Sequence, residues 1–305
     1  MPEFESPMLR RWELGNALRR IREDRGMTIA EVTTAMEEHY GSSFSATKLS
    51  RMETAKRGVI PRDVHDLCLL YEVPNADRDY LVELAKSARG PEVPGLDEQN
   101  RGYLWFAALE QVATEIREYS AMTVPGLLQT AEYARVVEDL VAAAPAYYEP
   151  RLGAGNVPAS AQDRVRMRLD RQYRLEPPNP LRLHTVLDIG VLMRRLPDPG
   201  IMHRQIEHLI QISRRPHVTI QVIPFEAGLY PGAEGSYWSI LDFPPGAGQP
   251  QRTVYLEVTG ANQLIERESE VSRMTSTFAI LSRLALGPDD SRGHMEYLLH
   301  DVARR

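Results

Sequence analysis

Hydrophobic residues recur every three or four positions in five short stretches of the first 89 residues. This spacing places them on one face of a helix, so each stretch predicts an amphipathic helix. The helices are expected over residues 14–25, 28–40 and 45–53, from residue 61 to about 71, and from residue 77 to about 88. Their inward positions include Leu14, Leu18, Ile29, Val32, Met36, Val64, Leu67, Cys68, Tyr71, Tyr80, Leu81, Leu84 and Ala88. Five short helices around one core predict a compact all-α domain over residues 1–89.

The second and third helices have clear start signals. Thr28 and Glu31 have the spacing of a capping box, in which each side chain binds a backbone amide that the first helical turn leaves free. Ser45 is a favourable N-cap for the third helix, because its hydroxyl accepts a hydrogen bond from such an amide. The two starts predict a turn near residues 41–44.

The third helix separates apolar from polar residues. At about 100° per residue, its inward face consists of Ala46, Leu49 and Met52. Thr47, Lys48 and Arg51 fall on the opposite face. Hydroxyl, ammonium and guanidinium groups are the donors that reach base edges and phosphates in the major groove of DNA. The third helix is therefore predicted to bind DNA.

The charge of this segment supports the same prediction. Five basic residues and one acidic residue lie between residues 44 and 62, whereas the whole chain of 305 residues has a net charge of −6. The predicted DNA-binding residues are Ser45, Thr47, Lys48, Ser50, Arg51, Lys56 and Arg57. Within this set, Thr47 and Arg51 are expected to contact base edges, and Ser45, Lys56 and Arg57 to contact phosphates.

Residues 14–89 resemble the xenobiotic-response-element (XRE) branch of the lambda-repressor-like helix-turn-helix regulators. The matching fragments are LRRIREDRGMT at residues 18–28 and KLSRME at residues 48–53. The resemblance implies a buried ion pair between an arginine of the first helix and the glutamate that ends the recognition helix, here Arg22 and Glu53. The pattern agrees, because Glu53 lies near the apolar face and its charge would be costly there without a partner. Helix-turn-helix proteins generally bind paired half-sites as dimers, so a homodimer is also expected.

A second domain is predicted after a linker. Residues 90–102 are rich in glycine, proline and charge, which is typical of a linker. Beyond them, strands are expected at residues 116–124, 181–187, 217–223, 237–243 and 253–258, and helices at 103–115, after 130, and at 159–175, 201–215, 266–286 and 289–303. The predicted chain is therefore multidomain: an all-α helix-turn-helix domain, then an α+β domain with a small mixed sheet over residues 103–305.

The second half shows no pattern of catalytic chemistry. His203 and His208 are five positions apart, which does not place two metal ligands on one helical face. Its serines lack the glycines of a nucleophile elbow, and its glycine-rich turns lack the lysine and hydroxyl of a phosphate loop. We therefore predict no enzymatic activity, no metal and no cofactor.

The expected location is the cytoplasm. No apolar run approaches the roughly 20 residues needed to cross a bilayer, and the first residues lack the pattern of a signal peptide. Cys68 is the only cysteine, so an internal disulfide is excluded, and its apolar surroundings predict a buried thiol.

The C-terminal half resembles a large actinobacterial family of antitoxin-like regulators. The matching fragments are EYSAMTVPGLLQTAEYA at residues 118–134, VTIQVIPF at 218–225 and YLEV at 255–258. The resemblance implies that this domain receives a signal, often through a small partner protein, and it supplies no catalytic residues. We therefore predict a sequence-specific transcriptional regulator whose C-terminal domain dimerises or receives a signal or partner. The alternative is an antitoxin-like protein whose main role is to bind a small partner protein, with autoregulatory DNA binding.

Three patterns in this half have two interpretations each. The arginine-rich residues 159–175 form either a solvated or subunit-facing helix or a second DNA contact. The block at residues 124–130 either shapes a turn or contacts a partner. Tyr230, Tyr237 and Trp238 either fill the core or line a pocket.

Overall fold

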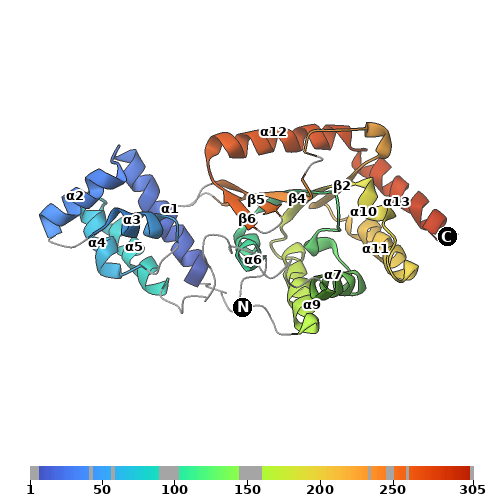
Figure 1. The fold of residues 1–305 in the computed structure, drawn as a ribbon, viewed down its shortest axis with the longest axis horizontal. Coiled ribbons are helices and arrows are strands. Elements are labelled where there is room, and N and C mark those ends of the chain that lie inside the picture. Colours follow the sequence, from blue (N-terminus) through green and yellow to red (C-terminus); the bar gives the residue numbers. More distant parts are fainter. Residues whose placement is uncertain are drawn as a thin grey trace. The chain divides into compact units, whose positions relative to one another are not determined.

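A computed structural model of the chain describes residues 7–40, 44–55, 59–88, 103–143, 160–232, 235–244, 251–258 and 261–302. The chain divides into two compact units, a helical N-terminal unit and a C-terminal unit built on a sheet (Figure 1). The predicted fold class is confirmed, since five helices come first and a mixed six-stranded sheet with helices follows.

The N-terminal unit consists of α1 (Pro7–Asp24), α2 (Ile29–Tyr40), α3 (Ala46–Glu53), α4 (Pro61–Leu70) and α5 (Asn75–Ser87). The first helix begins well before the predicted residue 14, and the fifth begins directly after Pro74. The capping box is present at the start of α2. The amide of Thr28 donates to Glu31 Oε2 over 2.7 Å, and the amide of Glu31 donates to Thr28 Oγ1 over 3.2 Å. Hydrogen bonds from Thr28 lower the pKa of the Glu31 carboxyl.

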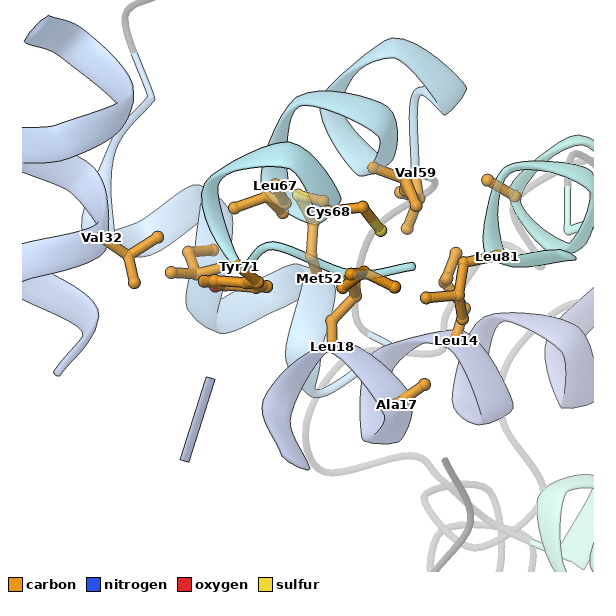
Figure 2. Packing of buried hydrophobic residues seen from close by; sticks show 14 of the residues in the cluster. Leu14, Ala17, Leu18, Val32, Met52, Val59, Leu67, Cys68, Tyr71 and Leu81 are labelled. Atoms are coloured by element: carbon orange, nitrogen blue, oxygen red, sulfur yellow. The ribbon is translucent and has the colours of Figure 1, made fainter. Parts of the chain in front are cut away.

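The apolar faces of these helices meet in one core (Figure 2). Leu14 and Leu18 of α1, Met52 of α3, Leu67 of α4 and Leu81 of α5 converge there, and all of them are buried. The helical spacing of apolar residues in the sequence therefore predicted most of the buried positions of this unit correctly.

Tyr80 of α5 does not belong to this core, contrary to the prediction. Its side chain is 47% exposed, and its hydroxyl donates to Glu13 Oε1 over 2.6 Å. A tyrosine has an apolar ring and a polar tip, so helical spacing alone is a weak guide to which way it points.

The first and third helices approach each other closely at Gly15. A Cβ atom built at this position would lie 2.6 Å from the carbonyl oxygen of Met52 and 2.9 Å from that of Glu53. Glycine is therefore what allows α1 to pack against the backbone of the last turn of α3.

The sheet of the C-terminal unit has the strand order β3-β2-β1-β4-β5-β6. Its strands are β1 (Glu115–Ser120), β2 (Arg182–Asp188), β3 (Val218–Ile223), β4 (Tyr237–Asp242), β5 (Arg252–Val258) and β6 (Ala261–Ile265). The pairs β1–β2 and β2–β3 are parallel, and the pairs β1–β4, β4–β5 and β5–β6 are antiparallel. The sequence did not predict β6, whose five residues lack a clear alternation of apolar and polar side chains.

Helices lie on both sides of this sheet. The described helices of the unit are α6 (Tyr103–Val112), α7 (Ala131–Ala143), α9 (Ala161–Asp170), α10 (Ile189–Met193), α11 (Pro199–Ile212), α12 (Glu268–Leu284) and α13 (Pro288–Val302), with the short 3-10 helices η1 (Gly126–Leu128), η2 (Arg171–Leu175) and η3 (Phe225–Ala227). Figure 1 shows α12 along one face, with α6, α7 and α9 on the other. Under α12, Trp238 is buried between Tyr119 and Phe278, so this aromatic residue fills the core.

Three arginines of α9 and η2 bind buried carboxylates within the same unit. Arg164 Nε and Arg168 Nη2 lie 2.7 and 2.9 Å from the two carboxylate oxygens of Glu138. Arg171 makes two bonds of 2.7 and 2.5 Å to Glu110. Both interpretations of this segment from the sequence missed this arrangement, because the partners come from α7 and α6.

The block at residues 124–130 is accounted for by its own packing. The side-chain amide of Gln129 donates to the carbonyl of Val124 over 2.6 Å, and that of buried Gln205 donates to the carbonyl of Leu128 over 2.7 Å. These bonds favour the structural interpretation of the block.

In helix α7, Leu140 does not face inward, contrary to the prediction. Its side chain is 55% exposed, because the inward face of the helix at this point is occupied by the buried carboxylate of Glu138, which binds Arg164 and Arg168.

Candidate nucleic-acid interface

The third helix begins with the predicted cap. Ser45 has an extended backbone, with φ −82° and ψ 152°, and its hydroxyl oxygen accepts a hydrogen bond from the amide of Lys48 over 3.1 Å. The preceding residue, Phe44, is buried in the core of the N-terminal unit. Together, an apolar anchor and a capping hydroxyl fix where α3 starts.

One face of α3 is buried and the other is exposed. Leu49, Met52 and Glu53 are buried. The exposed residues are Ser45, Ala46, Thr47 and Arg51, and Ser50 is half-buried. Ala46 was expected on the inward face, but it occupies the first turn of the helix, beyond the edge of the core. Arg51 has no hydrogen-bond or ionic partner among the residues that the structure describes.

A buried ion pair connects the end of α3 to α1. Arg22 Nε donates to Glu53 Oε1 over 2.6 Å, and Arg22 Nη2 donates to Glu53 Oε2 over 2.9 Å. The third nitrogen, Nη1, donates to the carbonyl of Met27 over 2.8 Å. The two side chains are 10% and 3% exposed, and the bonds with Glu53 raise the pKa of Arg22. Two parallel bonds fix orientation as well as distance, so this pair holds the helix in one position.

Lys48 is bound within the domain. Its Nζ atom lies 2.9 Å from Asp63 Oδ2 of α4 and 4.6 Å from the centre of the Phe44 ring. The side chain of Lys48 is 21% exposed and that of Asp63 is 14% exposed. No pattern in the sequence predicts this contact, because Asp63 is brought to Lys48 only by the packing of the next helix.

Two of the predicted phosphate-binding residues, Lys56 and Arg57, lie outside the described residues. Within the described part of α3, the exposed groups that can donate to DNA are the hydroxyls of Ser45 and Thr47 and the guanidinium of Arg51, with the hydroxyl of Ser50 partly accessible. They provide one cation and several hydroxyls on a single helical face.

The described residues contain no group of three or more histidine, cysteine, aspartate or glutamate side chains placed to hold a metal ion. Among the helices in the described ranges, none is both long and apolar enough to cross a lipid bilayer. Cys68 is buried in the helical core, and burial raises the pKa of its thiol to about 11.

Comparison with known proteins assigns a domain to each unit. Residues 13–81 match a model described as a helix-turn-helix domain, and residues 104–297 match a model described as a domain of unknown function (DUF5753). No curated protein and no solved structure matches the chain. Because the second model has no known function, the likeness to antitoxin-like regulators stays a prediction. The chain belongs to the DUF5753 family, and in this member a helix-turn-helix domain precedes the family's domain.

Proposed function

We propose that the protein is a sequence-specific transcriptional regulator that inserts α3 into the major groove of operator DNA. The observation that carries the proposal is the exposed polar face of α3 in a matched helix-turn-helix domain. In this arrangement Arg51 and Thr47 read base edges, and Ser45 holds a phosphate. Arginine commonly pairs through two bonds with the O6 and N7 atoms of guanine.

The rigidity of the helix supports the same proposal. Side chains can discriminate between bases only if the helix that carries them has one orientation in the groove. The buried pair of Arg22 and Glu53, the cap at Ser45 and the close approach at Gly15 each restrain α3. The exposed guanidinium of Arg51 is thus attached to a well-fixed frame.

A binding selection tests this function. The full-length protein is used to enrich duplexes from a random library, and its affinity for the selected duplex is compared with that for a scrambled one. Arg51→Ala should lose roughly 1–3 kcal/mol on the selected duplex and little on the scrambled duplex. The control is Arg20→Ala, which removes an exposed arginine of α1. Equal losses on both duplexes for Arg51→Ala, or equal effects of the two substitutions, would contradict base reading by α3.

The proposal includes a homodimer on paired half-sites. Helix-turn-helix dimers place their recognition helices one helical turn of DNA apart, about 34–36 Å. Native mass spectrometry of the complex should therefore find two protomers on one selected duplex, and the selected sequence should be close to palindromic. One protomer on an asymmetric site would contradict the dimer and leave DNA binding intact.

The C-terminal unit is proposed to receive a partner or signal. Support comes from large apolar side chains that stay exposed after the parallel strands β1, β2 and β3, namely Met122, Met193, Phe225 and Leu229. Phe225 is 62% exposed and Leu229 is fully exposed. Footprints on the protein's own upstream DNA should change when the product of the neighbouring gene is added. Leu229→Ser should weaken that change while the affinity for DNA alone stays the same.

A further inference from the structure

Lys48 lies at the edge of the exposed face of α3, but its side chain points away from that face, toward Asp63 of α4. Lys48 and Arg51 are three residues apart, so they lie about 60° apart around the helix axis. Arg51 is exposed, whereas the ammonium of Lys48 is bound to Asp63 and lies over the ring of Phe44. The two cations of this helix therefore have different surroundings, although they share one border of the DNA-facing surface.

Asp63 is well placed to keep Lys48 in this position. It lies in the first turn of α4, which begins with Pro61, and the free amides at a helix start stabilise a carboxylate there. With both side chains mostly shielded from water, the ion pair is screened less by salt than an exposed pair would be. A freely rotating lysine would instead extend along the groove edge, next to Arg51, where a DNA phosphate would lie.

Binding of a cation to a phosphate adds affinity without sequence preference. Each neutralised phosphate steepens the dependence of log K on log salt by about 0.9, and this component is the main source of binding to random DNA. A lysine kept away from the backbone therefore lowers the affinity for all DNA sequences by a similar factor and leaves the discrimination between them unchanged.

We propose that Asp63 withholds Lys48 from the DNA backbone, so that Lys48 positions α3 on α4 and does not bind phosphate. The inference rests on the proposed function, because it concerns the same helix in the same groove. It makes Lys48 a positioning residue and makes Asp63 a determinant of the sequence-independent affinity for DNA and of its salt dependence. In the absence of Asp63, Lys48 gains a phosphate contact.

Salt-dependent binding tests the proposal. Affinities for a selected and a scrambled duplex are measured by fluorescence anisotropy between 50 and 200 mM KCl, for the wild type, Asp63→Asn, Lys48→Ala and the double variant. Asp63→Asn should steepen the salt slope by about 0.9 and raise the affinity for both duplexes roughly fivefold to tenfold near 0.1 M salt. Lys48→Ala should leave the wild-type slope unchanged, and it should abolish the effect of Asp63→Asn. The matched control is Asp66→Asn, which removes a carboxylate of the same helix that does not contact Lys48.

Three results would overturn the proposal. One is an unchanged salt slope in Asp63→Asn. Another is an equal effect of Asp63→Asn with and without Lys48, which would indicate general electrostatics. The last is a slope in Lys48→Ala that is shallower than that of the wild type by about 0.9, which would mean that Lys48 binds phosphate despite its partner. If melting temperatures show that Asp63→Asn is unfolded, Asp63→Ser, which keeps a small polar side chain without the charge, takes its place with the same expected results. Failure of the wild type to prefer any duplex would refute the proposed function itself.

Lysine labelling gives a second readout that needs no DNA. The chain has three lysines, at positions 48, 56 and 86. With an amine-reactive acetylating reagent, Lys48 should react more slowly than Lys86, whose side chain is 56% exposed. In Asp63→Asn the labelling of Lys48 should accelerate while that of Lys86 stays constant. Equal labelling of both lysines in the wild type would show that the ion pair is not populated, and the proposal would fail.

Discussion

Replacing Glu118 with glutamine should stabilise the C-terminal unit at pH 8 and remove much of its pH dependence. Glu118 lies in β1, on the sheet face opposite α12, and is 2% exposed. Thr185 Oγ1 donates to one carboxylate oxygen over 2.7 Å, and the hydroxyl of Tyr237 donates to the other over 2.8 Å. Burial raises the pKa of Glu118 to about 7, and the two hydroxyl bonds reduce the shift only in part. The carboxylate of Glu110 also raises this pKa.

The magnitude follows from that pKa. A carboxyl whose pKa rises from 4.5 to about 7 on folding represents about 3 kcal/mol, since each pH unit corresponds to 1.36 kcal/mol. The folded state binds this proton more tightly than the unfolded state does. The stability is therefore highest below pH 4.5, falls as the pH rises toward 7 and is level above it. A glutamine amide does not ionise, so the variant should lack this fall.

The assay is urea unfolding at pH 5, 6, 7 and 8, followed by tryptophan fluorescence. A Trp12→Phe background restricts the signal to the C-terminal unit, because Trp12 lies in the helical unit. The free energy of unfolding of the parent should fall by about 2.5 kcal/mol between pH 5 and 8 relative to Glu118→Gln, because a smaller part of the full loss occurs below pH 5. Glu268→Gln, which removes an exposed carboxylate at the start of α12, should follow the parent. The same pH slope in Glu118→Gln and the parent would refute the reasoning.

Further substitutions probe the packing of both units. Gly15→Ala should destabilise the helical unit by about 1–3 kcal/mol in urea unfolding, because the added methyl group meets the backbone of α3. Gly293→Ala in α13 is the control for the C-terminal unit: a Cβ atom there meets nothing within 4 Å, so this unit should become more stable by about 0.5–1 kcal/mol. Arg22→Met should cost about 3–5 kcal/mol, since it leaves Glu53 buried without a partner; a loss below 1 kcal/mol would contradict a buried pair. Cys68 should resist thiol reagents in the native protein at pH 8 and react on unfolding, and rapid native labelling would contradict its burial.

Local signals in the sequence identified much of the helical unit. The spacing of apolar residues and the hydroxyl of Ser45 act over a few residues, so the sequence alone reveals where α3 starts and which side of it faces inward. The ion pair of Arg22 and Glu53 was predicted from the resemblance to helix-turn-helix regulators, together with the unfavourable free energy of burying a charge without a partner. The partner of Lys48 was not predicted, because Asp63 belongs to another helix and meets the lysine only in three dimensions.

The C-terminal unit was harder to predict for the same reason. Its arginine-rich segment has the composition of an exposed or DNA-binding helix, yet Arg168 and Arg171 are bound to glutamates of two other helices. Buried ion pairs place charged residues at inward positions of a helix, whereas a prediction from the spacing of apolar residues assigns only apolar residues to those positions. This is why Glu138 is buried on α7 and Leu140 is exposed.

Guanine methylation on the selected duplex tests the central claim most directly. If α3 lies in the major groove with Arg51 on a base edge, the wild-type protein should protect guanine N7 in each half-site from dimethyl sulfate. Arg51→Ala should restore the reactivity of one guanine in each half-site while the remaining protection stays. Unaltered protection in Arg51→Ala, or no protection of any guanine N7 by the wild type, would contradict the account.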